Sequence, residues 1–212
     1  LGIYATDEDA AEAPLDNIMT IPDKTKYGGD VIWDDVDGNG VIDDRDRVKV
    51  GNIYPDLTGG VNANVQYAGL SLGIRTDFAI GHTIYNQSRA TFLGQFQGDI
   101  NTLKEVNNSW QKPGDVTDIP RYWFADQQAQ SNLFRGNSNF YEKGDYLALR
   151  EITIGYNLPQ HLVNKIHLSG AMISFTGANL TYLTTYKGLA PEEGGTDDGR
   201  YPLSRTYTFN IN

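Results

Sequence analysis

The sequence predicts an all-β protein whose antiparallel strands each present one apolar and one polar face. First, alternation of apolar and polar residues with a period of two recurs in several separate segments, and this is the side-chain period of a β-strand. Second, these segments contain few strong helix formers. Third, glycine (23) and tyrosine (13) are abundant among the 212 residues, while apolar residues make up only 39%.

The first 55 residues are acidic and turn-rich, and one loop stands out among them. Asp35 to Asp46 reads DVDGNGVIDDRD, in which Asp35, Asp37 and Asn39 occupy alternate positions and Gly40 follows. This is the register D-x-[DN]-x-[DN]-G of an EF-hand-type calcium loop, in which alternate side chains supply oxygen ligands and the glycine allows a sharp turn. Here strands follow the loop instead of a helix.

The loop therefore predicts one structural Ca²⁺. The expected ligands are the side chains of Asp35, Asp37, Asn39 and Asp46, the carbonyl of Val41, and Asp43 either directly or through water. The last position is normally a bidentate Glu, and the shorter Asp46 predicts weaker binding. The alternative is a loop rich in Asp, Asn and Gly whose side chains only cap their own turns.

The first patterned segments form a hairpin. In residues 60–67 (GVNANVQY), Val61, Ala63, Val65 and Tyr67 alternate with amide side chains. Residues 70–80 (LSLGIRTDFAI) place their apolar residues and Thr76 on one face and Ser71, Gly73, Arg75 and Asp77 on the other. The two residues Ala68 and Gly69 lie between these segments, as in a tight hairpin.

Residues 81–144 show no comparable alternation, and a connection of this length is usually functional. It contains scattered aromatic residues, of which four are candidates for contact with a substrate or a partner: Trp110, Tyr122, Trp123 and Phe124. Flat apolar rings with polar neighbours suit stacking on sugar rings or peptide side chains. The alternative is that they pack the loop against the rest of the protein.

Three more strands are expected after this connection. In residues 145–158, Ile152, Ile154, Tyr156 and Leu158 share one face, but Leu147 and Leu149 lie in the opposite phase. A phase switch near Arg150 predicts a β-bulge, or an upper part of the strand outside the apolar zone. Residues 169–181 form the next strand, the loop 182–203 follows, and residues 205–212 (RTYTFNIN) form the last strand.

The five predicted strands are joined alternately by short turns and by the long loops 81–144 and 182–203, which is the plan of an outer-membrane β-barrel. The polar faces, with Arg75 and Asp77, would then line a solvated lumen, and the apolar faces would contact lipid. The apolar faces are represented by Leu72, Ile74, Ile80, Ile152, Ile154, Ile173, Phe175 and Phe209. Patterning alone also permits a soluble β-sandwich.

Composition excludes several other classes. The 17 basic and 27 acidic residues give a formal charge of −10, which disfavours nucleic acid as a partner. The absence of cysteine excludes a disulfide framework and cysteine-bound zinc. No apolar run is long enough for a transmembrane helix.

An enzymatic function is not indicated by the sequence, which contains no nucleophile elbow or phosphate-binding loop. His82, His161 and His167 lack the spacing of metal ligands. The carboxylate pairs Glu192/Glu193 and Asp197/Asp198 are expected in a solvated loop. No catalytic residue is therefore predicted.

Four blocks of sequence, in order, resemble the C-terminal third of SusC/RagA-type TonB-linked outer-membrane transporters. The first, residues 29–72, runs from GDVIWDDVDGNG through GNIYPDLTGG into the first hairpin. The others are YEKGDYLALREITIGYNLP, SGAMISFTGANLTYLTTYKGLAPE and the terminal YPLSRTYTFNIN. The resemblance covers residues 29 to 212 apart from the loop 90–135.

The resemblance implies the last five or so strands of a larger barrel of about 22 strands. It places the region 1–55, with the calcium loop, and the two long loops outside the cell, and it assigns residues 56–212 to barrel strands and loops. The protein would be part of a TonB-dependent importer of glycans or peptides in the outer membrane of a Gram-negative cell. A SusD-like surface lipoprotein would act as its lid.

The resemblance further implies that TonB acts through a plug segment not contained in these residues. Because the chain begins at Leu1 and stops at Asn212, where such barrels usually end in an aromatic residue, we expect it to be a piece of a longer protein. The alternative from another class is a secreted, calcium-stabilised β-sandwich module that binds glycans. An adhesin or scaffold segment is a third reading.

Overall fold

A computed structural model describes residues 2–94, 101–123, 132–192 and 194–212. The chain divides into two compact units. The loop unit comprises Leu1–Gly51 and Tyr85–Glu142, and the sheet unit comprises Asn52–Ile84 and Lys143–Asn212. No helix among the described residues is long and apolar enough to cross a membrane.

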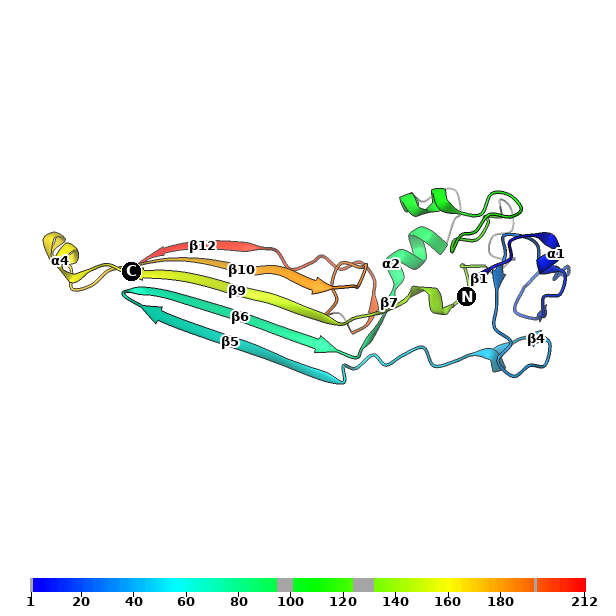
Figure 1. Ribbon diagram of the computed structural model, residues 1–212, viewed down its shortest axis with the longest axis horizontal. Helices are drawn as coiled ribbons and strands as arrows, with labels where there is room; N and C mark the ends of the chain where they lie inside the picture. The colour runs from blue at the N-terminus through cyan, green and yellow to red at the C-terminus, as the bar shows by residue number, and fades with distance from the viewer. Residues whose placement is uncertain (1, 95–100, 124–131, 193) are drawn as a thin grey trace. The chain divides into compact units, whose positions relative to one another are not determined.

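The sheet unit contains one sheet of five antiparallel strands (Figure 1). Their order across the sheet is β12-β10-β9-β6-β5. The strands are β5 (Leu57–Tyr67), β6 (Leu70–Ile80), β9 (Tyr146–Asn157), β10 (Met172–Thr184) and β12 (Thr206–Ile211). The predicted all-β class is thus confirmed, although β10 begins and ends three residues later than the predicted 169–181.

The register gathers the apolar side chains into rows that cross the sheet. Leu72 of β6 pairs with one residue of β5 and one of β9, and the pairing continues through β10 to β12. The resulting row is Val65, Leu72, Ile154, Phe175 and Phe209. None of the eight residues predicted to face outward is buried, and Ile154 and Phe209 are 49% and 62% exposed. Within the described part of the chain, these side chains are therefore not enclosed in a core between two sheets, as they would be in a sandwich.

The opposite face carries the polar rows. Arg75 pairs with Asn62 of β5 and with Glu151 of β9. One step along, the hydroxyl groups of Thr153 and Thr176 are hydrogen-bonded to each other at 2.9 Å. Arg75 and Asp77 lie on this polar side of β6, as the alternation predicts.

The bulge expected near Arg150 is present. The pairing of β6 with β9 passes from Arg75–Glu151 directly to Thr76–Leu149, so that Arg150 has no partner in β6. One extra residue restores the phase. Leu149 and Leu147 thereby join the apolar face that Ile152 and Ile154 occupy, which explains the apparent reversal in the sequence.

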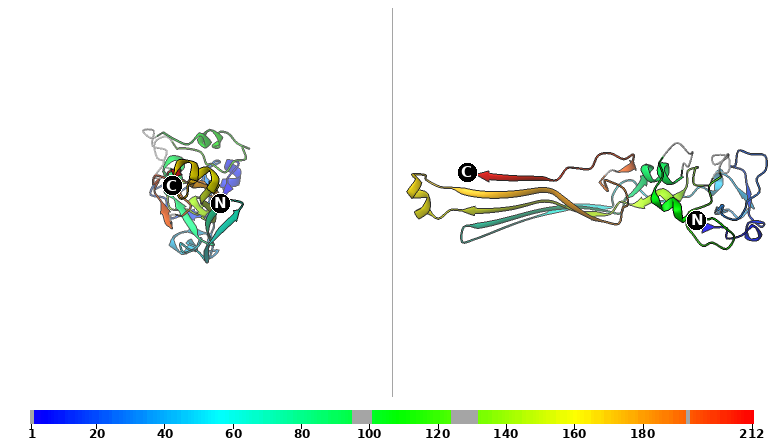
Figure 2. Two further views of the ribbon diagram at one scale, coloured as in Figure 1. Left: turned by 90° about the vertical axis from the view of Figure 1, so that its left-hand side faces the viewer. Right: turned by 90° about the horizontal axis from the view of Figure 1, so that it is seen from above.

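Short connections lie at one end of the sheet. The turn between β5 and β6 has Ala68 and Gly69 at φ 49° and 86°, the left-handed values that a two-residue hairpin requires. The helical turn α4 (Gln160–Val163) and Asn212 are at the same end (Figures 1 and 2). The loop between β10 and β12, which contains β11 (Gly195–Asp197), leaves the opposite end.

The loop unit is built from short elements. β1 (Gly2–Ile3) pairs with β3 (Val31–Ile32), and β2 (Leu15–Asp16) runs parallel to β4 (Val41–Ile42). Its helical turns are α1 (Asp7–Ala10), η1 (Asp44–Asp46), α2 (Gln87–Arg89), η2 (Ala90–Gly94), η3 (Lys104–Asn108) and η4 (Ser138–Phe140). The strands β7 (Thr83–Asn86) and β8 (Tyr141–Lys143) lie where the chain passes between the units.

A small hydrophobic core holds the loop unit together. It consists of Val31, Ala90, Leu93, Ile119, Leu133 and Phe140. Leu103, Val106 and Tyr122 pack against it from the connection that shows no periodicity in the sequence. The long connection therefore contributes much of the core of this unit.

Candidate functional sites

The predicted calcium loop brings three of its carboxylates together. Oxygen atoms of Asp35, Asp37 and Asp46 all lie within 4.8 Å of one another. Among the residues that the structure describes, this is the one cluster of three or more acidic, His or Cys ligands. Hard oxygen donors at this spacing are the set that Ca²⁺ takes, and the arrangement fits the ion.

Backbone hydrogen bonds fix the direction of these carboxylates. Asp35 accepts from the amides of Asn39 and Gly40 at 3.1 and 2.6 Å, and Asp37 also accepts from Asn39 at 3.1 Å. Asp46 accepts from the amide of Val36 at 2.9 Å. These bonds form the turn-capping contacts of the alternative reading. They also preorganise the loop, because each carboxylate is held with further lone pairs available.

Two other predicted ligands, Asn39 and Asp43, make contacts outside the carboxylate cluster. Asn39 is exposed and accepts from the amide of Val41 at 2.8 Å. Asp43 lies outside the cluster, and its carboxylate pairs with the guanidinium of Arg45 at 2.9 Å, while Arg45 also lies 3.7 Å from Asp37. Hydrogen bonds from the Arg45 side chain and backbone lower the pKa of Asp43. A direct role for Asp43 in metal binding would therefore require it to release Arg45.

The loop aromatics are packed into the loop unit. Trp110 is only 8% exposed, and its indole nitrogen donates to the carbonyl of Ala5 at 3.2 Å. Tyr122 donates to the carbonyl of Leu93 at 2.6 Å, and burial raises its pKa to about 12. These contacts match the packing alternative. A binding role for the set stays a prediction, and Phe124 lies outside the described residues.

Arg121 links two of these aromatic residues. Its guanidinium lies 4.2 Å from the ring centre of Trp123 and 5.4 Å from that of Trp110. The indole nitrogen of Trp123 donates to the buried carboxylate of Asp30 at 2.9 Å. Cation–π contacts and a satisfied indole stabilise this cluster.

The polar side of the sheet carries an ionic cluster centred on Arg150. Its guanidinium pairs with Asp77 of β6 and with Glu192 of the loop that follows β10. It also donates to the hydroxyl of Tyr182 at 3.1 Å. The bulge turns Arg150 toward these partners. The sequence did not predict any contact among Arg150, Asp77, Glu192 and Tyr182.

The loop that contains Glu192 is held by further contacts. His82 is buried and its Nε2 donates to the carbonyl of Pro191 at 2.9 Å. Asp197 is 1% exposed and accepts from the hydroxyl of Tyr186 at 2.7 Å. The expectation that both carboxylate pairs are solvated was wrong for Asp197, because local turns bury it. Glu193 lies outside the described residues.

A shallow cavity of about 560 Å³ lies over the polar face of the sheet. Its polar lining is Asn62, Asn64, Gln66, Ser71, Arg75, Glu151 and Thr153. Amides, hydroxyls and one pair of opposite charges form a surface that binds water and polar solutes, and such a surface suits the wall of an aqueous passage.

The chain is similar in sequence to curated TonB-dependent receptors and in structure to a solved transporter. No family model matches the chain. TonB-dependent receptor P3 of Formosa agariphila is 29% identical over 206 residues, which are 91% of this chain and 20% of that protein. TonB-dependent receptor P26 of the same organism is 26% identical over 87% of this chain and 19% of its own length.

Solved structures of the RagAB peptide transporter are also similar. One matches with a TM-score of 0.63 at 28% identity over 75% of this chain and 17% of that chain. RagAB in the closed-closed state matches with a TM-score of 0.62 at 27% identity over the same shares. The chain spans about a fifth of the length of the curated relatives it matches. It matches a C-terminal segment of SusC/RagA-type TonB-dependent receptors, which confirms the resemblance seen in the sequence.

Proposed function

We propose that this chain is part of the barrel wall and outer loops of a TonB-dependent importer in the outer membrane. One observation carries the proposal: a five-stranded antiparallel sheet with an exposed apolar face and a polar opposite face. A transmembrane barrel requires this combination, with lipid outside and water inside. The similarity to TonB-dependent receptors and to RagAB supports the same function.

The five strands would form the last part of a closed barrel of about 22 strands. The turn at Ala68 and Gly69 and the α4 region would then face the periplasm. The loops at the other end of the sheet would face the cell exterior. Transport would be driven by TonB acting on a plug encoded elsewhere in the full protein, so no residue of this chain acts as a catalyst.

The cargo would be a peptide or a glycan, admitted under a SusD-like surface lipoprotein. RagAB is described as a peptide transporter, which supports peptides. The amide and hydroxyl side chains on the polar face support either cargo, because both are recognised by hydrogen bonds. A secreted β-sandwich module is disfavoured, since it would have to cover the apolar face with a second sheet.

Ca²⁺ in the Asp35–Asp46 loop would be structural. The five aspartate carboxylates of this twelve-residue loop repel one another, and a bound cation offsets that repulsion. The millimolar calcium outside a cell would fill even a weak site. The ion would order the loop without taking part in transport.

Site-directed labelling tests the proposal in a full-length protein whose cysteines outside this chain are replaced, because the chain itself contains none. Single cysteines would replace Ile154 on the apolar face and Thr153 on the polar face of the full-length protein in native outer membranes. We expect a membrane-confined maleimide to label Ile154→Cys and a bulky water-soluble maleimide to label Thr153→Cys. Labelling of Ile154→Cys by the water-soluble reagent alone would exclude a lipid-facing sheet.

A further inference from the structure

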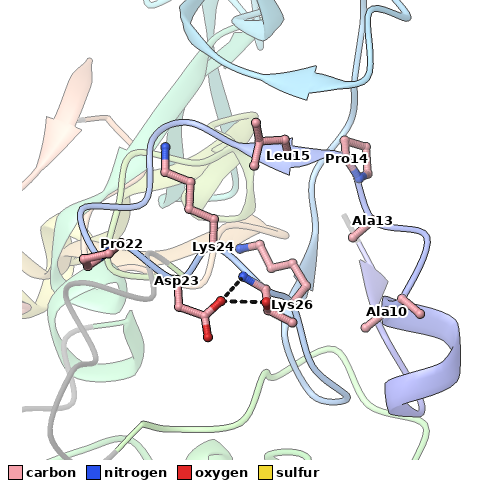
Figure 3. Close-up of a pocket in the computed structure, with 10 residues that line it drawn as sticks. Ala10, Ala13, Pro14, Leu15, Pro22, Asp23, Lys24 and Lys26 are labelled. Atoms are coloured by element: carbon pink, nitrogen blue, oxygen red, sulfur yellow. Dashed lines mark hydrogen bonds between the residues drawn. The ribbon is translucent and has the colours of Figure 1, made fainter.

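Two cavities of the molecule differ in whether their charged side chains are available to a ligand. In a cavity of about 400 Å³ in the loop unit, both lysines of the lining are engaged (Figure 3). Lys26 is enclosed against the carboxylate of Asp16 at 2.9 Å, and Arg135 donates to the same carboxylate at 2.8 Å. Lys24 donates to the side chain of Asn17 at 2.9 Å. The cavity over the polar face of the sheet differs, because its charged residues have no ionic partner.

Arg75 of β6 and Glu151 of β9 are two opposite charges that line this second cavity. Their backbones are paired directly across the two strands, which places their Cβ atoms about 5 Å apart. They nevertheless form no ion pair in the described structure, where the Arg75 guanidinium is exposed and has no hydrogen-bond partner. Glu151 is half-buried and accepts one long hydrogen bond, of 3.4 Å, from Thr153. Both charges are therefore available to a ligand.

The neighbouring charges on this side of the sheet are paired among themselves. Asp77, the next charged residue of β6, is bound by the guanidinium of Arg150, which also pairs with Glu192. Together with Arg75 and Glu151, the group comprises two guanidiniums and three carboxylates. Because the net charge is slightly negative, a simple anion is not favoured here. A ligand that carries both signs of charge is.

Gly73 leaves room on the floor of the cavity. It is paired with Asn64 on one side and with Thr153 on the other, and a Cβ at this position would lie 3.1 Å from the amide oxygen of Asn64. The missing side chain opens a space beside the row of Arg75 and Glu151. The cavity of about 560 Å³ lies within the usual range of small-molecule sites.

Three amide side chains border this space. Asn62, Asn64 and Gln66 occupy alternate positions of β5 and line the cavity from one side. All three are exposed, and in the described part of the chain their side chains neither donate nor accept a hydrogen bond. A primary amide offers both donors and an acceptor, so it can bind both the N–H and the C=O of a peptide group.

We propose that Arg75 and Glu151 bind a small zwitterion, in particular a dipeptide with free ends. The carboxylate pairs with Arg75, the ammonium pairs with Glu151, and the peptide group lies against the amides of β5. Such a ligand satisfies both residues at once, whereas a ligand with one charge leaves the other residue unpaired. The inference rests on the proposed function, because it assigns a class of cargo to the passage that the polar face would line.

Calorimetry on the detergent-purified full-length protein tests the inference with probes of similar size and different charge. L-alanyl-L-alanine carries both charges, N-acetyl-L-alanyl-L-alanine only the carboxylate, and L-alanyl-L-alaninamide only the ammonium. We expect the zwitterion to bind at least fivefold more tightly than either singly charged probe and than the neutral disaccharide maltose. Equal binding of the three peptide probes, or tighter binding of maltose, would overturn the proposal.

Two variants that each remove one charge locate the binding. Arg75→Gln should weaken binding of L-alanyl-L-alanine about fivefold without weakening that of L-alanyl-L-alaninamide, which lacks the carboxylate. Glu151→Gln should have a similar effect on L-alanyl-L-alanine without weakening N-acetyl-L-alanyl-L-alanine. The matched control is Arg205→Gln, an exposed arginine of the same unit that does not line the cavity. Weaker dipeptide binding in this control would overturn the proposal, because it would show a diffuse effect of charge.

The labelling of Ile154→Cys and Thr153→Cys tests the barrel wall independently of this site. If the labelling follows expectation and the probes bind equally, this inference fails and the proposed function stands. If the water-soluble reagent alone labels Ile154→Cys, the proposed function fails whatever the probes do.

Discussion

Arg150 on β9 and Glu192 in the loop after β10 form an ion pair across 42 residues of sequence. The same nitrogen of Arg150 also contacts Asp77 of β6 at 2.9 Å. Because Asp77 and Arg150 belong to neighbouring strands, their geometry is fixed by the sheet. Glu192 belongs to a loop, so the pair attaches that loop to the polar side of the sheet.

Glu192→Gln should loosen this loop. The variant keeps the size of the side chain but removes its charge, and the pair is partly exposed, with 16% and 26% of the two side chains accessible. A loss of about 1 kcal/mol, after allowance for screening by solvent, corresponds to roughly fivefold more frequent opening. Hydrogen exchange of the amides in residues 186–192 measures it. Asp198→Asn, an exposed carboxylate of the same loop, should leave exchange unchanged.

Ile154→Arg should destabilise the full-length protein in lipid by about 2–4 kcal/mol if the position lies near the bilayer midplane. The reason is that the apolar face would carry a charge into hydrocarbon. Thr153→Arg, one residue away on the polar face, is the matched control and should cost much less. Urea titration in bilayers gives both values, and equal costs would contradict the assignment of the two faces.

Asp16→Asn should destabilise the loop unit at neutral pH by about 3 kcal/mol, because it leaves two buried cations without a counter-charge. Burial raises the pKa of Asp16, but the charges of Lys26 and Arg135 outweigh burial and lower it overall. A lowered pKa in the folded state stabilises the protein above the unfolded value of about 4, and this contribution is lost as the pH falls below it.

The difference between wild type and Asp16→Asn should therefore be constant from pH 5 to 8 and shrink below about pH 4. Hydrogen exchange of Val31 and other core amides of the loop unit follows it. A difference that grows toward low pH would mean that the pKa of Asp16 is raised and that the ion pairs do not dominate.

Asp35→Ala combined with Asp37→Ala should abolish calcium binding and raise the protease sensitivity of residues 35–46, with little change in cargo affinity. Both residues belong to the carboxylate cluster. Asp34→Ala is the control, because this exposed neighbour lies outside the cluster. If calorimetry detects no binding at millimolar calcium, or chelator leaves the loop equally protected, the turn-capping interpretation stands.

A partner or cargo contact of the 81–144 connection needs a conservative test. Removing residues 100–130 would delete Leu103, Val106 and Ile119, which pack in the core of the loop unit. Val116 is 98% exposed, so Val116→Asp changes the surface of the connection alone. Weaker association with the proposed SusD-like lipoprotein would support the contact, and an unaltered affinity would exclude Val116 from it.

The sheet was predictable because period-two alternation is local. The bulge at Arg150 was predictable for the same reason, since Leu147 and Leu149 reverse the phase. The loop unit was not, because its stability depends on contacts such as that between Val31 and Asn132, which are 101 residues apart. Nor does the sequence show that Asp197 is buried, because this depends on a hydrogen bond from the hydroxyl of Tyr186, eleven residues away.

The outermost strands of the sheet, β5 and β12, each have one neighbour among the described residues. Their free edges present rows of unpaired backbone donors and acceptors, which are templates for further strand addition. Produced alone, this stretch of chain would be prone to stack edge to edge into ordered aggregates. In the proposed barrel, further strands would pair with both edges, so folding of this sheet and its insertion into the membrane would become one event.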